Sequence, residues 1–372
     1  MKKMFSAVLV FTALLISLSV PASANTVITL STPSHQLADG RFINDDLAVL
    51  LSPGGDLNNA LTNPVRGQRT WVIDPALLEE VTDLADGYVY LDLNGEEVSV
   101  SELPIAQEWL DLLQFISRND RVVASTYGGP AIAYLKRFAP GELSLYNQFS
   151  QTRLQALLGR EVSAPGVLSQ SSMAAPLVAQ NSYTSLRKTM RVINALVTTV
   201  DVENLRLGLA KTLNPNLPQE DALAITRSYI VRVSEFQNRA RISPGNYTIT
   251  ASQYDLPVTV INDFDQQVTM DLEITTTNSR VVVGEVPRIT IDARSQIQIK
   301  VPIDVIASGD TALRLQLRTP RGSAIGEIER IPLRLAVISP ITTWFTTGMA
   351  IILLLAAVIQ SVRRVKRRKQ HE

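Results

Sequence analysis

Apolar and polar residues alternate along the second half of the chain. Period-two alternation runs through Val268–Ile274, Ile297–Ile303 and Leu313–Leu317. Successive side chains of a strand point to opposite faces, so this pattern is typical of strands with one buried face. Roughly seven such strands fit in residues 246–338. The pattern therefore predicts an Ig-like antiparallel β-sandwich over residues 245–340.

The first part of the chain combines short apolar runs with segments of helical periodicity. The runs Thr26–Leu30, Thr70–Ile73 and Arg121–Ser125 predict buried strands. Between them we expect helices over Asn44–Leu51, Asp74–Glu80 and Pro104–Arg118. Over Tyr88–Val100 we expect a hairpin that turns at an Asn-Gly pair. Strands that alternate with helices are typical of parallel βα units. We therefore expect a multidomain chain, α/β followed by all-β, with a partial (β/α)-barrel-like domain over residues 25–170.

Helical spacing dominates the region between these two parts. Leu186, Met190, Ile193 and Val197 recur every three or four positions, which predicts an amphipathic helix. We expect residues 171–244 to form a helical segment that packs on the α/β domain.

The N-terminus has the layout of a secretory signal peptide. Two lysines follow Met1, an apolar run extends from Ala7 to Val20, and small residues occupy positions 22 and 24. This three-part pattern predicts a signal peptide over residues 1–24. The alternative is an uncleaved anchor, but the run is short against the ~20 residues that a spanning helix needs.

The C-terminus predicts a membrane anchor. Residues 341–362 contain no charged side chain, and 22 residues of helix extend about 33 Å, enough for a ~30 Å hydrocarbon core. Trp344 lies near the outer end, where interfacial aromatics occur. A basic tail over residues 363–372 marks the cytoplasmic side; its cations are Arg363, Arg364, Lys366, Arg367, Arg368 and Lys369. We expect a single-pass protein of the cell membrane, in contact with lipid, whose N-terminal ectodomain is extracytoplasmic.

Composition narrows the chemistry of this ectodomain. Residues 25–340 carry 27 basic and 34 acidic side chains, a net charge of −7, which argues against a nucleic-acid partner. The chain has no cysteine and only two histidines, His35 and His371. Thiolate metal sites and a site with two ectodomain histidines are therefore excluded, and no cofactor or metal is predicted.

Several segments together resemble a known family. They are Phe42–Leu47, Ser52–Gly55, Thr70–Leu78, Glu108–Leu110 and Leu256–Asn262, followed by the sandwich, span and basic tail. In this order they resemble an uncharacterised family of actinobacterial envelope proteins, whose members tend to be encoded beside the flippase for the peptidoglycan lipid precursor. The resemblance covers most of residues 40–368. It implies a cell-wall context but supplies no catalytic residues, and this chain is shorter than typical members.

Candidate site residues lie where the predicted strands end. In barrel-like domains the carboxyl ends of the strands carry the functional groups; here they are His35, Asp45, Asp46, Asp74, Ser125 and Tyr127. Asp74, the pair Asp45 and Asp46, and His35 also have structural interpretations, which we favour; for His35 it is a surface or capping role. Asp74 precedes Pro75 as a helix N-cap would, and Asp45 with Asp46 would complement a helix dipole.

Three functions remain open. The leading hypothesis is a non-catalytic envelope protein that presents a binding domain to wall glycan or to an exported or membrane partner. One alternative is a glycosidase- or deacetylase-like enzyme on a degenerate barrel, for which two carboxylates would suffice. The other is an accessory subunit of a membrane complex that transports wall precursors.

Overall fold

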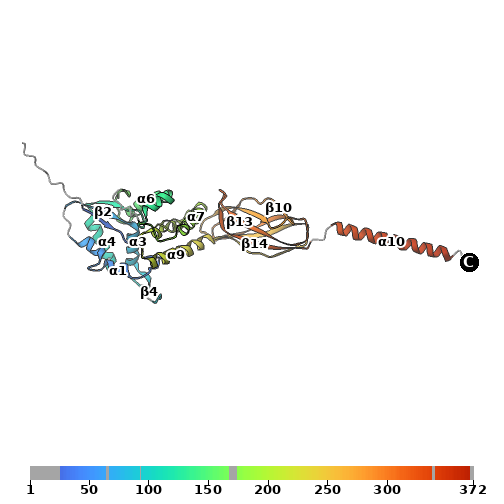
Figure 1. Cartoon of the computed structure of the whole chain (residues 1–372), viewed down its shortest axis with the longest axis horizontal. Helices are drawn as coiled ribbons and strands as arrows, with labels where there is room; N and C mark the ends of the chain where they lie inside the picture. The colour runs from blue at the N-terminus through green and yellow to red at the C-terminus, as the bar shows by residue number, and fades with distance from the viewer. Residues whose placement is uncertain (1–25, 64–66, 93, 167–173, 337–339, 369–372) are drawn as a thin grey trace, which may run out of the picture.

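The computed structural model describes residues 26–63, 67–92, 94–166, 174–336 and 340–368. The parts follow one another along an elongated molecule: a mixed α/β part, a helical region, two β-sheets and a C-terminal helix (Figure 1). The chain is thus a multidomain protein of mixed helix and strand. The signal peptide predicted over residues 1–24 lies outside the described residues.

A three-stranded parallel sheet forms the centre of the α/β part, in the order β1-β2-β5. The strands are β1 Thr26–Leu30, β2 Arg69–Ile73 and β5 Arg121–Ala124. Five of the described helices contribute to its core cluster; they are α1 Asp46–Leu51, α2 Asp56–Thr62, α3 Pro75–Asp86, α4 Pro104–Ser117 and α6 Pro140–Leu158. The predicted parallel βα arrangement is confirmed.

The prediction that Thr26–Leu30 is a buried strand is wrong. The strand is present, but its residues alternate between half-buried and exposed; only Leu30 is buried, and Val27 is 43% exposed. β1 is an edge strand that pairs only with β2, so its apolar residues are not covered on every side. β2 lies in the middle of the sheet and buries Trp71 almost completely, as expected.

The predicted hairpin is present as β3 Tyr88–Leu91 and β4 Glu97–Val100. Gly95 adopts φ +79° in the connecting turn, a conformation that an L side chain rarely adopts. The turn predicted from the Asn-Gly pair is therefore confirmed.

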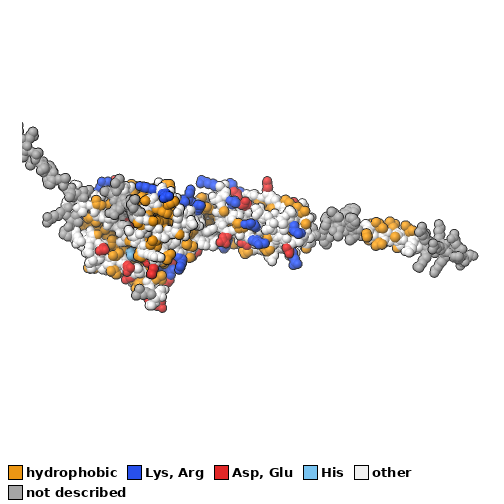
Figure 2. All heavy atoms as spheres, viewed as in Figure 1, with side chains coloured by type: hydrophobic (Ala, Val, Ile, Leu, Met, Phe, Trp, Pro, Cys, Tyr) orange, Lys and Arg blue, Asp and Glu red, His pale blue; other side chains and the backbone are white. Residues whose placement is uncertain are grey.

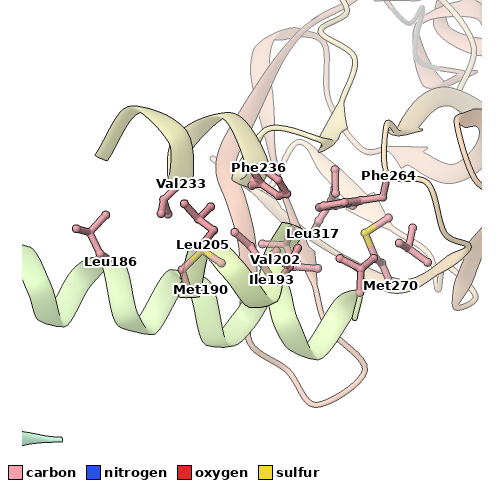
Figure 3. Close-up of a cluster of buried hydrophobic side chains, with 14 of the residues drawn as sticks. Leu186, Met190, Ile193, Val202, Leu205, Val233, Phe236, Phe264, Met270 and Leu317 are labelled. Atoms are coloured by element: carbon pink, nitrogen blue, oxygen red, sulfur yellow. The ribbon is translucent and has the colours of Figure 1, made fainter. Parts of the chain in front are cut away.

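The helical region connects the α/β part to the sheets through a continuous core. Its elements are α5 Ile132–Phe138, α6 Pro140–Leu158, α7 Gln180–Leu196, α8 Val200–Gly208, the 3-10 turn η1 Lys211–Leu213 and α9 Gln219–Gln237. Figure 3 shows Met190 and Ile193 of α7 and Phe236 of α9 in one cluster with Phe264 and Met270 of the sheets. These helices thus pack on the β part as well as on the α/β domain.

Two sheets follow, and they share one buried core. One sheet has the order β10-β12-β8-β6 and the other β11-β9-β13-β14-β7. The strands are β6 Ala240–Ile242, β7 Tyr247–Ile249, β8 Gln253–Asn262, β9 Val268–Thr276, β10 Val281–Val283, β11 Ile289–Ile291, β12 Ser295–Val305, β13 Gly309–Arg318 and β14 Ala324–Leu335.

The sheets contain nine described strands rather than roughly seven. The difference arises at two places where the chain passes from one sheet to the other. Residues 240–249 pair first with β8 and then with β14, and residues 281–291 pair first with β12 and then with β9. Each crossing divides one extended segment into two short strands, which side-chain alternation alone does not reveal.

Helix α10, Pro340–Arg368, lies beyond the sheets at the far end of the molecule (Figure 1). Among the residues that the structure describes, no helix is both long enough and apolar enough to cross a membrane. Side chains of α10 are described for residues 347–361 only. The anchor residues predicted at Trp344 and in the basic tail from Arg363 to Lys369 therefore lie outside the described side chains.

Candidate functional site

A cleft of about 580 Å³ lies between α3, at the carboxyl edge of the parallel sheet, and helices α8 and α9. Loops that follow β1 and β5 complete it, so it occupies the edge where parallel sheets usually bind ligands. Its principal polar and aromatic lining residues are Gln36, Glu79, Asp83, Tyr127, Arg153, Asp201, Asn204, Lys211, Tyr229, Arg232 and Phe236.

Beneath the cleft, a buried ion pair joins α3 to η1. Lys211 Nζ lies 2.8 Å from Glu80 Oε1, and both side chains are at least 94% buried. Ser34 donates its hydroxyl to the same carboxylate oxygen, and the His35 backbone N–H donates to the other, at 3.0 Å. The carboxylate is therefore fully satisfied, as a buried charge must be.

The two partners hold each other in the charged state. Burial by itself raises the pKa of Glu80, but the Lys211 charge and the hydrogen bonds outweigh it and leave the pKa below its usual range. Burial likewise opposes the charge on Lys211, yet Glu80 and the neighbouring tyrosines hold its pKa well above its ordinary value. The pair thus connects the α/β domain to the helical region.

A second network lies at the cleft wall. Arg153 Nη1 of α6 lies 3.2 Å from Glu79 Oε1, and Tyr127 donates its hydroxyl to the other oxygen of the same carboxylate. Burial and the Glu79 charge raise the pKa of Tyr127 well above its ordinary value. Arg153 also donates to Asn204 of α8. Glu79 therefore faces the cleft with its partners already in place.

Asp83 is the second α3 carboxylate that lines the cleft. Gln36 Nε2 donates to it at 2.6 Å. Burial raises the pKa of Asp83, despite the hydrogen bond from Gln36 and the charge of Lys211. A polar ligand that replaced Gln36 as the donor would find this carboxylate exposed at the cleft surface.

Asp74 acts as the N-cap of α3. Its Oδ1 accepts the backbone N–H groups of Ala76 and Gly128, each at 3.0 Å. Burial raises its pKa to about 7 against the effect of these bonds. The side chain is 1% exposed and does not line the cleft, so it has no access to a ligand bound there.

The other predicted site residues are distributed rather than gathered. Only Tyr127 of the predicted set lines the cleft. Asp45 accepts the Tyr88 hydroxyl, and Asp46 accepts an Asn44 amide N–H at 2.7 Å in the first turn of α1. The residues described contain no group of three or more His, Cys, Asp or Glu side chains that could hold a metal ion.

His35 and Ser125 have no part in the cleft lining. Each has a buried side-chain atom without a hydrogen-bond partner, Nε2 in His35 and Oγ in Ser125. Gly128 and Gly129 form a turn with φ of +73° and +58°. In this turn the Gly128 N–H donates a hydrogen bond to Asp74.

Sequence patterns did not predict Glu80 and Lys211, the buried pair beneath the cleft. Glu80 lies between apolar residues of the buried face of α3, and Lys211 lies between Ala210 and Leu213, which are both fully buried. A charged residue inside an apolar stripe is a weak signal for a buried pair. The identity of its partner depends on the fold, because 131 positions separate the two.

Comparisons with solved structures concern small parts of the chain. A C. elegans MSP family member, WR4, matches 26% of this chain and 98% of its own length, at 11% identity and a TM-score of 0.21. Native alpha-2-macroglobulin and the chaperone DraB, both from E. coli, match 26% and 27% of this chain, at 10% and 14% identity, with TM-scores of 0.21 and 0.20. This chain spans 16% and 57% of those two structures. No curated protein matches the chain.

A comparison with family profiles gives a match over residues 146–370. The matched region contains α7, α8 and α9, all of the strands from β6 to β14, and α10. It agrees with the family resemblance seen in the sequence from the sandwich to the tail. The chain belongs to a family of unknown function, DUF6049.

Proposed function

We propose that this protein is a non-catalytic, membrane-anchored envelope protein that binds cell-wall glycan in the cleft between α3, α8 and α9. The observation that carries the proposal is the composition of this cleft. At about 580 Å³ it falls within the range of sites for small ligands. Most of its lining side chains can form hydrogen bonds, and the aromatic ones, Tyr127, Tyr229 and Phe236, are at most 4% exposed.

Charge balance in the cleft favours a neutral polar ligand. Three acidic residues, Glu79, Asp83 and Asp201, line it together with three basic ones, Arg153, Lys211 and Arg232. A strongly anionic or cationic ligand would gain no net attraction from such a lining. Sugar hydroxyls both donate and accept hydrogen bonds, so a glycan suits this polar lining.

Existing contacts of the acidic groups support binding rather than hydrolysis. Glu79 is already paired with Arg153 and Tyr127. The pKa of Asp74, near 7, would suit a general acid, but this residue caps a helix and does not line the cleft. Glu80 is likewise enclosed by its own partners.

The anchor belongs to the proposal as well. The apolar run over residues 341–362 and the basic residues after it support a span with the tail in the cytoplasm. Large apolar side chains on the described part of α10 are exposed, among them Ile352, Leu353 and Leu354, and Figure 2 shows them as a hydrophobic surface. The two sheets, as an Ig-like stalk, would hold the cleft away from the lipid.

Calorimetric titration of the full-length protein in detergent with soluble peptidoglycan fragments tests the glycan proposal. Asp83→Asn should weaken binding about tenfold because it removes a cleft carboxylate. Asp111→Asn is the matched control, since Asp111 on α4 accepts from Gln107 Nε2 at 2.8 Å, much as Asp83 accepts from Gln36. It should bind like the wild type.

Two outcomes would overturn the proposal. Equal affinities of the wild type and the Asp83 variant for the fragments would show that the fragments do not bind in the cleft. Release of reducing sugar ends from peptidoglycan, lost in Glu79→Gln while folding is retained, would favour the enzymatic alternative instead.

A further inference from the structure

One stretch of strand β12 has an open backbone edge. β8 pairs with β12 from Ser295 to Asp304, but β10 pairs with it only at residues 303–305. The β10 side is extended by one contact, in which the Gly284 N–H donates to the Pro302 carbonyl at 2.9 Å. From residue 296 to residue 300, no described strand pairs with the side of β12 that faces away from β8.

Neighbouring hydrogen bonds show which backbone groups face this open side. Val305 donates its N–H toward the β8 side, to the Ser252 carbonyl. Ile306 donates its N–H to the other side, to the Arg280 carbonyl. Because both polar groups of a strand residue point to the same side and alternate along the strand, the even-numbered residues face outward. Gln296, Gln298 and Lys300 therefore present N–H and C=O groups at the open edge.

Side chains on the inner face of β12 also lack cover along this stretch. Ile303, opposite Val283 of β10, is 2% exposed. Ile297 lies beyond the reach of β10 and is 38% exposed, and Ile299 is half-buried. Where β10 is present it adds Val281 and Val283 at alternate positions. An added strand with the same alternation would cover the two isoleucines.

The open edge along β14, which β7 pairs only at residues 333–335, is protected more strongly than this one. β14 carries Glu327, Glu329 and Arg330, and its pairing with β13 shifts register near a left-handed Gly326. Charges and bulges of this kind discourage strand addition. Residues 296–300 of β12 contain one charge, Lys300, and no proline.

We propose that the open edge of β12, residues 296–300, binds an extended segment of another protein as an added β-strand. The segment carries apolar side chains at alternate positions to cover Ile297 and Ile299. An acidic residue in the segment would suit the cation of Lys300. Backbone hydrogen bonds supply the affinity and the alternating side chains supply the selectivity, as in other cases of strand addition.

A second copy of this chain fits the edge poorly. Antiparallel pairing of two β12 strands needs a two-fold axis across the strands, which sends the two α10 helices in opposite directions. Under the proposed anchoring, both helices must enter the same membrane. Parallel pairing in register would place like backbone groups opposite each other.

The test uses the full-length protein in detergent and a short fluorescent peptide of alternating Val and Thr that ends in Asp. A peptide of the same composition with its valines grouped together is the control ligand. Fluorescence anisotropy should show that the wild type binds the alternating peptide and not the grouped one. Gln298→Pro should weaken binding about tenfold, because it removes an outward N–H that has no partner strand. Gln298→Ala keeps this N–H and should bind within twofold of the wild type.

Hydrogen exchange gives a second measurement that does not depend on the folding of the proline variant. In the wild type, peptide addition should slow exchange of the amides of Gln296, Gln298 and Lys300. Unchanged exchange at saturating peptide, absence of binding by the wild type, or equal binding by the proline variant would overturn the proposal. Without peptide, the same amides could become protected as the protein concentration rises. If the protein then also has a dimeric mass, the edge serves self-association, and the proposal is overturned.

Discussion

Lys211 and Glu80 form the most deeply buried of the ion pairs found within the described residues. Taking two charges out of water costs free energy that a well-hydrogen-bonded pair recovers. Removal of one partner leaves the other charge buried and uncompensated. The stability of the cleft region should therefore depend strongly on both residues.

Lys211→Met should lower the free energy of unfolding by about 3–5 kcal/mol. Urea denaturation monitored by tryptophan fluorescence measures it, because Trp71 and Trp109 are buried in the adjoining domain. Arg288→Met breaks the exposed pair with Asp271 and should leave the free energy of unfolding almost unchanged. Similar losses of unfolding free energy in the two variants would contradict the large stabilising contribution expected of the buried pair.

Asp74 gives a pH-dependent prediction. Its pKa is raised from 3.8 to about 7 in the folded state, so between these values the folded protein holds a proton that the unfolded chain has released. This contribution to stability is present below pH 4 and is lost as the pH rises toward 7. Asp74→Asn removes the ionisation and keeps an acceptor for the Ala76 and Gly128 N–H groups.

The stability of Asp74→Asn relative to the wild type should therefore increase from pH 4 to pH 7, by roughly 1–3 kcal/mol. Urea midpoints across this range measure the difference. A constant difference between the two proteins would show that Asp74 titrates normally in the folded state.

At the scale of elements, α9 has one face in the core shared with the sheets and one face in solvent. Val233 is 3% exposed and Val231 is 53% exposed, so the same substitution can be made on both faces of one helix. Val233→Ala should cost about 2 kcal/mol of unfolding free energy, and Val231→Ala should cost less than about 0.5 kcal/mol.

Thermal unfolding monitored by circular dichroism compares the two variants. The buried variant should also speed amide exchange in the neighbouring strands, since Phe236 of α9 and Phe264 share one core. Equal midpoints would mean that α9 packs too loosely to couple with the sheets.

Local sequence patterns predicted elements wherever local chemistry determines them. Asp74 followed by Pro75 marked the junction of β2 and α3, and Asn94 with Gly95 marked the hairpin turn. The strand crossings at residues 240–249 and 281–291 were not predictable, because alternation reports which side chains are buried and not which sheet supplies the backbone partner.

Most of the cleft could not be predicted from the sequence, for a related reason. Its walls come from the loop after β1, from α3 and from helices near residue 205, which only the chain topology brings together. Of the predicted site residues, Tyr127 could be placed because it follows a strand at the functional edge of a parallel sheet. Glu79 and Arg153 had no such positional signal.

At the scale of the whole molecule, the proposed anchor yields a direct prediction. The full-length chain should remain in the membrane pellet after extraction with alkaline carbonate, and a chain that ends at residue 340 should appear in the soluble fraction. Replacing the cations of residues 363–369 with Gln should leave the protein in the membrane, because the apolar run supplies most of the binding free energy. Release of the full-length chain by carbonate would contradict the anchor.

The core that runs without interruption from α7 and α9 into the sheets also has a mechanical consequence. Thr198 and Gln266 reinforce it through two hydrogen bonds, of 3.3 and 3.0 Å, between the helical region and the sheets. A flexible linker would let the cleft explore a wide volume, whereas this junction fixes it at one end of a stiff strut. Strand β12 alone, with 11 residues, extends roughly 36 Å. On an anchored chain, this strut would set the greatest distance between the cleft and the membrane, and the ligand would have to lie within that reach.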